Sequence, residues 1–130
     1  MTALYASWRE VAPADWVWPH FSPREIACRG DGSLLVVPAF LNLLEKLRDK
    51  LGRPLTVNCA YRSALHNARV GGAPMSEHKF GRAADIACAK DQRTDLLLAA
   101  RAVGFTGFGF YASFLHLDIG LTRTWGTAWN

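Results

Sequence analysis

The sequence has few cysteines, no long apolar run and no concentrated block of one charge. Its three cysteines, Cys28, Cys59 and Cys88, form no CxxC or CxxxxC pair, so a zinc finger has no support and at most one disulfide is possible. We expect reduced thiols, with Cys59 and Cys88 as small buried side chains in strands. The apolar stretches are far shorter than the roughly 20 residues that span a bilayer, so no membrane span is predicted.

The N-terminal residues 1–16 also lack the basic segment followed by an apolar segment that marks a secretory signal. The sequence therefore predicts synthesis in the cytoplasm without a visible signal peptide. The 15 basic and 11 acidic residues give a net charge of +4, and the basic residues are spread along the chain. This distribution forms no nucleic-acid-binding arm. A mild basic excess suits an acidic partner such as an anionic polymer, a membrane surface or nucleic acid, and a small nucleic-acid binder is the least favoured class.

The length and the balanced composition predict one globular domain over residues 1–130. Residues 1–35 are rich in Trp and Pro and are predicted to form an irregular N-terminal wrap. Residues 36–125 are predicted to form the core, which would hold the functional site.

Within that core, apolar residues at helical spacing predict one helix over residues 38–51 and another over 91–103, the second capped by Asp91. Strand-like runs are predicted at residues 54–60, 83–89, 107–111 and 114–119. The last two runs are joined by a connection of hairpin length, which makes them antiparallel. The sequence therefore predicts an α+β fold, with a small, mainly antiparallel sheet and helices packed against it.

The segment SEHKFGRAAD, Ser76 to Asp85, contains two side chains suited to bind zinc, the imidazole of His78 and the carboxylate of Asp85. If Asp85 lies on a strand, its carboxylate is held rigidly beside the loop that presents His78. Taken alone, the same residues also fit a hydrogen-bonded loop histidine and an aspartate that caps a turn.

A second polar pair lies in FLHLDIG, Phe114 to Gly120. Residues two apart on a strand face the same side, so His116 and Asp118 are predicted to share one face. Large apolar neighbours imply burial, which costs several kcal/mol unless each polar group is paired or bound to a metal. A satisfied buried pair and a metal site both fit this pattern.

A third element, CAYRS, places Arg62 just after an apolar strand. A guanidinium at a strand end can bind a carboxylate or stabilise a developing oxyanion. A surface ion pair is the alternative interpretation of Arg62.

Together these elements give the order YRS…HN..VGGA..S.H..G.AADI…GF.G.G.Y..FLHLD.G..R.W. This order closely resembles the zinc D-Ala-D-Ala carboxypeptidases, D,D-peptidases that share their fold with the Hedgehog signalling domain. The resemblance implies that His78, Asp85 and His116 bind one Zn²⁺ ion. It also implies that Arg62 contacts a carboxylate or carbonyl of the substrate.

One departure concerns the catalytic base. Many members of the family have an acidic residue three positions before the last ligand, where this sequence has Ser113. The chain resembles the branch with an aspartate two positions after that ligand, namely Asp118. Asp118 is then either the base or an acceptor that orients His116. Glu77 is another candidate for the base, and Ser76, Tyr111 and Trp125 are candidate residues around the substrate.

The resemblance implies a peptidoglycan stem peptide as the substrate and a monomeric zinc metallopeptidase as the protein. The short chain without a visible signal looks like a phage or prophage endolysin that reaches the cell wall or periplasm after release by a holin. The ligand set is shared by D,D-carboxypeptidases, D,D-endopeptidases and L-alanyl–D-glutamate endopeptidases, so the bond that is cut stays open. The alternative function is a non-catalytic, zinc-containing module that binds the cell wall.

Overall fold

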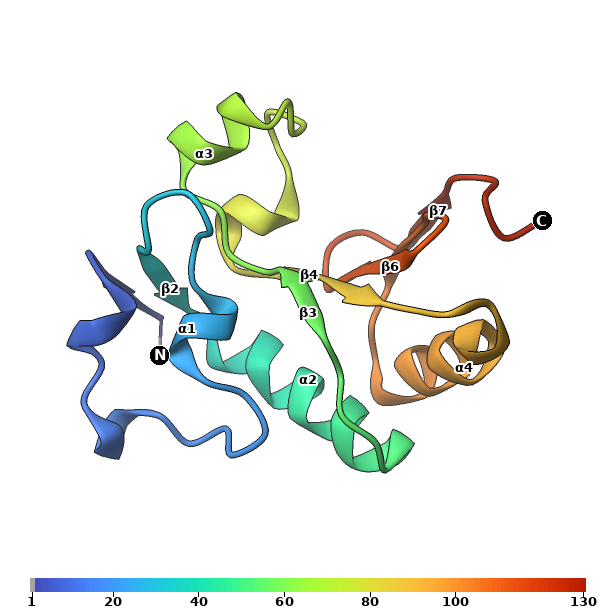
Figure 1. Cartoon of the computed structure of the whole chain (residues 1–130), viewed down its shortest axis with the longest axis horizontal. Helices are drawn as coiled ribbons and strands as arrows, with labels where there is room; N and C mark the ends of the chain where they lie inside the picture. Colours follow the sequence, from blue (N-terminus) through green and yellow to red (C-terminus); the bar gives the residue numbers. More distant parts are fainter. Residues whose placement is uncertain (1) are drawn as a thin grey trace.

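The computed structural model describes residues 2–130 as a sheet with helices around it (Figure 1). The helices are α1 (Pro23–Ile26), α2 (Pro38–Leu51), α3 (Ala64–Arg69) and α4 (Arg93–Val103). The strands are β1 (Ala3–Tyr5), β2 (Leu34–Val36), β3 (Val57–Cys59), β4 (Ala83–Ala87), β5 (Gly107–Phe110), β6 (Phe114–Asp118) and β7 (Arg123–Trp125). Within these residues no helix is long and apolar enough to cross a bilayer.

The main sheet has five strands in the order β3-β4-β6-β5-β7. The pairs β3–β4, β4–β6 and β5–β6 are antiparallel, which confirms the predicted hairpin between β5 and β6. The edge strand β7 pairs with β5 in parallel, so the sheet is mixed. The α+β class is confirmed, and the parallel edge strand is an addition that the sequence pattern did not predict.

The two faces of this sheet differ in polarity because side chains alternate along each strand. On one face Ile86, Leu115 and Leu117 are buried in the apolar core together with residues of α2 and α4. On the other face lie the polar side chains Asp85 and His116, which are directly opposite each other in the β4–β6 register. The sheet therefore supports a polar site on the side away from its hydrophobic core.

Helix α2 follows the predicted pattern closely. Phe40, Leu41, Leu44 and Leu47 are all buried in the core, and the helix ends before Gly52, which has the left-handed conformation (φ 66°). Helix α4 departs from the prediction at its start. Asp91 does not cap it, because residues 90–92 form a separate short 3-10 helix and α4 begins at Arg93.

The N-terminal region is more ordered than the predicted irregular wrap over residues 1–35. Strands β1 and β2 form a two-stranded antiparallel sheet. Ser22 and Glu25 form a capping box at the start of α1, as the spacing of Ser22, Pro23 and Glu25 in the sequence predicts. Trp18 and Phe21 are buried in the main core. Strands of three residues are too short to show a periodic pattern, which explains why the sequence did not reveal them.

Candidate metal centre

Three side chains from separate parts of the chain meet at the polar face of the sheet. Asp85 lies in the middle of β4, His116 lies opposite it on β6, and His78 lies in the short 3-10 helix Glu77–Phe80. The Asp85 Oδ1 atom is 3.1 Å from His78 Nε2 and 3.0 Å from His116 Nδ1. All three residues are buried, so the structure brings together the three predicted metal ligands.

The outer nitrogen of each histidine has its own partner. His78 Nδ1 is 2.5 Å from the carbonyl oxygen of Ala60, and His116 Nε2 is 2.7 Å from Asp118 Oδ2. A carbonyl and a carboxylate are acceptors, so these outer nitrogens hold the protons of neutral imidazoles. The inner nitrogens then direct lone pairs toward Asp85 Oδ1. Three electron-rich atoms this close require a cation between them, either a proton or a metal ion.

The electrostatics of the metal-free site agree with this requirement. Burial lowers the pKa of His78, but hydrogen bonds and charge interactions with Asp85 and Cys59 outweigh it and raise the pKa to about 9. Burial also raises the pKa of Asp85, but His116 and His78 outweigh it and hold that pKa well below its ordinary value. The site therefore binds positive charge strongly.

The donor set fits zinc. Two imidazole nitrogens and one carboxylate oxygen are common zinc ligands, and donors of a tetrahedral zinc lie about 3.3 Å apart for bonds of about 2.0–2.1 Å. The distances of 3.0 and 3.1 Å around Asp85 Oδ1 are close to that value. His78, Asp85 and His116 would hold the ion, and all three line a cavity of about 520 Å³ open to solvent.

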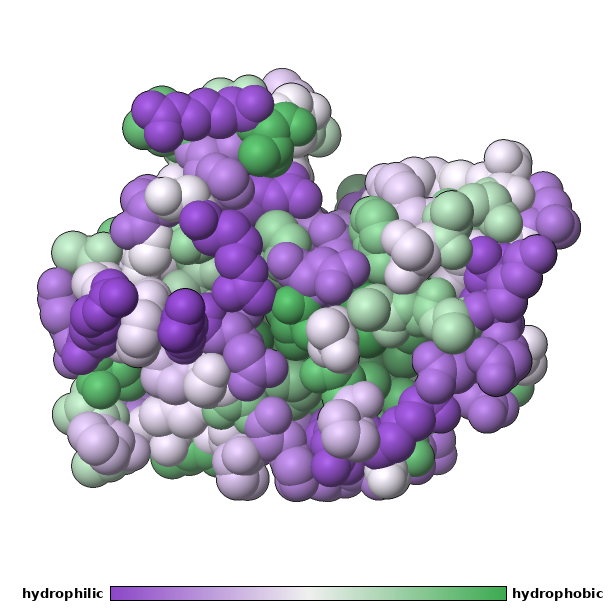
Figure 2. All heavy atoms as spheres, in the orientation of Figure 1, coloured by the Kyte–Doolittle hydropathy of each residue, from purple (hydrophilic) through white to green (hydrophobic). Residues whose placement is uncertain are grey.

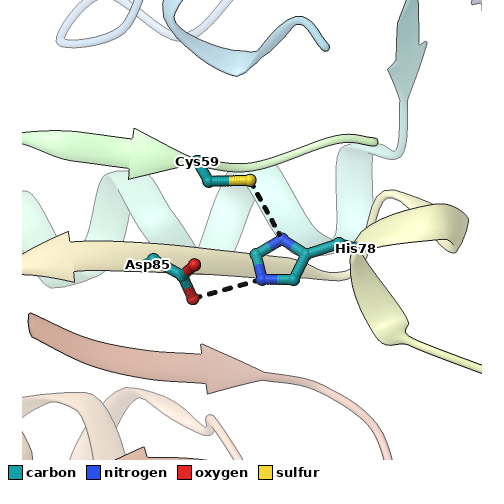
Figure 3. A group of neighbouring side chains, drawn as sticks. All are labelled: Cys59, His78 and Asp85. Atoms are coloured by element: carbon teal, nitrogen blue, oxygen red, sulfur yellow. Dashed lines mark hydrogen bonds and ion pairs between the residues drawn. The ribbon is translucent and has the colours of Figure 1, made fainter. Parts of the chain in front are cut away.

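Cys59 offers an alternative donor. Its Sγ atom, a nitrogen of His78 and a carboxylate oxygen of Asp85 lie within 4.8 Å of one another. Figure 3 shows, however, that Cys59 approaches the Nδ1 edge of the His78 ring, whereas Asp85 meets the Nε2 edge. Nδ1 already faces the Ala60 carbonyl, and Cys59 Sγ accepts a hydrogen bond from Arg62 Nε at 3.2 Å. We therefore favour His116 over Cys59 as the third ligand.

Cys59 thus differs from the small buried side chain that its apolar strand predicts. It is only partly buried, and hydrogen bonds and charge interactions with His78 and Arg62 outweigh desolvation and lower the pKa of its thiol. All three cysteines are free in the structure.

Asp118 is fully buried behind His116 and all its acceptor positions are occupied. Its Oδ2 atom faces His116 Nε2 at 2.7 Å and Arg123 Nη2 at 2.8 Å. Its Oδ1 atom accepts from Arg123 Nη1 at 2.9 Å and from the Gly120 amide at 3.0 Å. Burial raises the pKa of Asp118, but these partners outweigh it and lower the pKa. This environment favours the orienting role for Asp118 over the role of base.

Two glycines of β5 make room for these contacts. Gly107 lies between Asp118 of β6 and Arg123 of β7 in the register, and a Cβ there would be 2.1 Å from both side chains. Gly109 lies between His116 and Trp125, and a Cβ there would be 2.5 Å from the Trp125 ring. The bare face of β5 therefore lets side chains of the edge strand reach Asp118 and His116 on β6.

Arg62 lies beside Asp85 at the cavity wall. Its Nη2 atom is 3.8 Å from Asp85 Oδ2, and its Nη1 atom donates to Asn67 Oδ1 at 3.0 Å. The Arg62 side chain is largely but not fully buried and lines the cavity. The guanidinium is therefore accessible to a ligand that lies next to the three donors.

The remaining predicted residues take different positions. Ser76 lines the cavity and caps the 3-10 helix by accepting from the His78 amide at 3.3 Å. Tyr111 and Trp125 line the opposite wall, where Trp125 Nε1 donates to Tyr111 Oη at 3.0 Å. In Figure 2 the outline of the molecule is notched between the α3 side and the β6–β7 side. Ser113 is exposed in the hairpin between β5 and β6 and does not line the cavity.

A His₂Asp centre at the wall of an open cavity is the kind of site that metallopeptidases use. The chain matches the peptidase M15 family over residues 19–118 and belongs to that family of zinc peptidases. This match confirms the family predicted from the motifs, and its range includes all three candidate ligands.

A curated relative is the zinc D-Ala-D-Ala carboxypeptidase of Streptomyces albus G. The two proteins are 36% identical over 88 residues, which make up 63% of this chain and 34% of the relative. The aligned region therefore spans about a third of the length of the relative.

Sequence reasoning missed three residues that support the site. In the sequence, Asn67 and Arg123 stand out only as positions of the motif order, in HN and R.W, and Cys59 is predicted only to be a small buried side chain. The pattern R.W, Arg123 to Trp125, was the available signal for β7, because residues two apart on a strand share a face. Only the pairing of β7 with β5 shows that this face meets Asp118 and His116.

Proposed function

We propose that this chain is a zinc-dependent peptidase that hydrolyses a peptide bond in the stem peptide or cross-link of peptidoglycan. One observation is central to the proposal. His78 Nε2 and His116 Nδ1 both lie within 3.1 Å of Asp85 Oδ1 at the wall of an open cavity, next to the accessible edge of Arg62. The likeness to a zinc D-Ala-D-Ala carboxypeptidase supports the substrate class.

Zinc bound at this centre would polarise a carbonyl and lower the pKa of a water molecule to about 7. The residues of the chain supply the other functions. Arg62 offers N–H donors to a carboxylate or to a developing oxyanion. Tyr111 Oη already accepts from Trp125 Nε1, so its own proton is free to be donated to a substrate oxygen.

Glu77 is our candidate for the proton acceptor. Glu77 lines the same cavity, and Arg82 meets both oxygens of its carboxylate, with Nη2 3.0 Å from Oε1 and Nε 2.8 Å from the buried Oε2. Asp118 is enclosed by its four partners and is not among the described residues that line the cavity. Changing Glu77 to Gln should leave zinc bound and slow turnover by about 10²- to 10⁴-fold, as expected for loss of a general base. Unchanged turnover would assign the proton transfer to another group.

The test of the proposed function is a digest of purified peptidoglycan by the zinc-loaded protein, with mass spectrometry of the muropeptides. Loss of D-Ala would indicate a carboxypeptidase, and new free amines within the stem or cross-link an endopeptidase. We expect products that disappear when a chelator is added and in the His116→Ala variant. The matched control is His20→Ala, the same change at an exposed histidine away from the cavity, and its products should persist. Products that are independent of zinc, or absent from every wall type, would refute the proposal.

The second candidate is a non-catalytic, zinc-containing module that binds the cell wall. Ser113 is exposed and Asp118 is enclosed, so neither supplies a general base and only Glu77 is left as a candidate. This shortage of a base favours the non-catalytic module. Zinc-dependent sedimentation with peptidoglycan, without any product, would establish this function instead.

For the cellular setting we propose phage or prophage lysis, with a monomer acting on the wall or periplasm after release from the cytoplasm by a holin. Expression in a host cell with and without a holin tests this setting. We expect lysis only when both are present, and lysis that does not depend on the holin would contradict the proposal.

A further inference from the structure

The guanidinium of Arg62 is held on two of its sides by residues outside the metal centre. Its Nε atom donates to Cys59 Sγ at 3.2 Å, and its Nη1 atom donates to Asn67 Oδ1 at 3.0 Å. Arginine has five N–H donors, so three remain on the Nη1 and Nη2 edge. Nη2 is 3.8 Å from Asp85 Oδ2, which is beyond hydrogen-bond distance, and within residues 2–130 it has no hydrogen-bond partner, so its donors are available to a ligand in the cavity.

Asn67 is an unusual partner because it is a buried polar residue with both ends of its amide bonded. Only 3% of its surface is exposed. Its Oδ1 atom accepts from Arg62, and its Nδ2 atom donates to the carbonyl of Ala73 at 2.9 Å. The backbone carbonyl of Asn67 also accepts from the Gly72 amide at 2.9 Å. Asn67 therefore links Arg62 to the loop over residues 71–74 that forms one wall of the cavity.

Gly72 packs directly against this pair. A Cβ at position 72 would be 2.1 Å from Asn67 Oδ1 and 2.8 Å from Arg62 Nη1. Gly72 is not among the glycines with positive φ, so its backbone conformation does not itself demand glycine. The close approach of the Asn67 and Arg62 side chains is the feature that leaves no space for a side chain at this position.

We infer that Asn67 is a positioning residue for Arg62. Its fixed amide holds the guanidinium so that the free Nη2 edge points at a carboxylate or oxyanion beside the metal centre. A bonded guanidinium loses little rotational freedom when the ligand binds, because that freedom is already lost in the folded protein. The catalytic part of this inference rests on the proposed peptidase function, whereas the positioning itself does not.

The positioning is tested by ¹⁵N NMR of the Arg62 Nη groups, which are identified by their absence in Arg62→Lys. A held guanidinium gives separate Nη1 and Nη2 signals, and a rotating one gives a single averaged signal. We expect separate signals in the unaltered chain and in Asn67→Asp, which keeps the acceptor, but averaging in Asn67→Ala. Asn58→Ala, the same change at an exposed asparagine on β3, is the matched control and should leave the signals separate.

Separate signals that persist in Asn67→Ala would overturn the inference, whether or not the chain hydrolyses peptidoglycan. Gly72→Ala provides a second route if Asn67→Ala does not fold, because it removes no hydrogen-bonding group and only displaces the pair. We expect averaging of the Nη signals in Gly72→Ala, and unchanged signals there would also contradict the inference.

The catalytic consequence is measured by a double-mutant cycle. Asn67→Ala should lower kcat/KM by about 10- to 100-fold, the range for a hydrogen bond to a charged group, with zinc content unchanged. In the Arg62→Lys background the same change should have an effect of less than about 3-fold, because lysine has no Nη1 to hold. Equal effects in both backgrounds would show that Asn67 acts through the loop and not through Arg62.

Discussion

Replacing Asp118 by Asn separates the orienting role of this residue from the role of base. All four groups that meet the Asp118 carboxylate are donors: His116 Nε2, the Gly120 amide and two nitrogens of Arg123. An amide has the same shape but offers an acceptor on one side only. Either orientation of the new amide therefore sets its own N–H groups against two of these donors.

The orientation decides how the metal centre is affected. If the amide nitrogen faces His116 Nε2, the ring proton moves to His116 Nδ1 and blocks the atom that would bind zinc. If the amide oxygen faces His116, the amide nitrogen faces Gly120 and Arg123. Loss of a hydrogen-bonded charge in this buried position should destabilise the protein by about 1.5–3 kcal/mol. Loss of the orienting contact should weaken zinc affinity by about 10- to 100-fold.

The assay is a competition between the protein and a chromophoric chelator of known zinc affinity, together with thermal unfolding of the metal-free form. Asp95→Asn is the matched control, because Asp95 is exposed on α4. We expect weaker zinc binding in Asp118→Asn and none of this effect in the control. Unchanged zinc affinity with lost turnover would refute the orienting role and assign Asp118 as the base.

Three further predictions concern pH, the aromatic wall and the core. Because the pKa of His78 is raised from 6.5 to about 9, its proton stabilises the metal-free fold fully below pH 6.5, and that stabilisation is lost as the pH rises toward 9. Zinc displaces this proton, so the gain in Tm from excess zinc should be larger at about pH 8 than at about pH 6. Equal gains at the two pH values would contradict zinc binding by His78. Gly109→Ala should displace Trp125 from Tyr111. We expect KM to rise by about 5- to 10-fold with zinc content unchanged. An unchanged KM would show that the wall formed by Tyr111 and Trp125 does not contact the substrate. Leu44→Ala, at a fully buried position of α2, should cost about 2–5 kcal/mol in denaturant unfolding while bound zinc is retained once folded.

Much of the fold was predictable because its central elements follow simple periodic patterns. The α2 helix has apolar residues at helical spacing and a glycine at its end. The strands β4 and β6 are five-residue segments in which apolar residues flank Asp85 on β4 and His116 on β6. The shared face of His116 and Asp118 followed from the two-residue repeat of a strand. The meeting of His78 with Asp85 was expected from the family resemblance, since their seven-residue separation alone fits many structures.

The features that were missed depend on strand pairing and on turns of the chain that no periodic pattern encodes. The strands β1, β2 and β7 have three residues each, and their pairing partners are not encoded in any local pattern. Arg123 reaches Asp118 because Gly107 of the intervening strand has no side chain, which is a property of the register. Asn67 meets Arg62, five residues before it, because the chain turns into α3 directly after Ser63. Sequence spacing therefore predicted the ligand types, and tertiary packing determined what surrounds them.

The central claim is that His78, Asp85 and His116 form one zinc site. The most direct measurement is the zinc content of the purified chain after dialysis against limiting zinc, compared with single alanine variants of these residues and of Cys59. The structure predicts about one zinc ion per chain, lost in each of the three ligand variants and retained in Cys59→Ala. Retention of zinc in His116→Ala together with its loss in Cys59→Ala would contradict the account and place the metal on the other edge of His78.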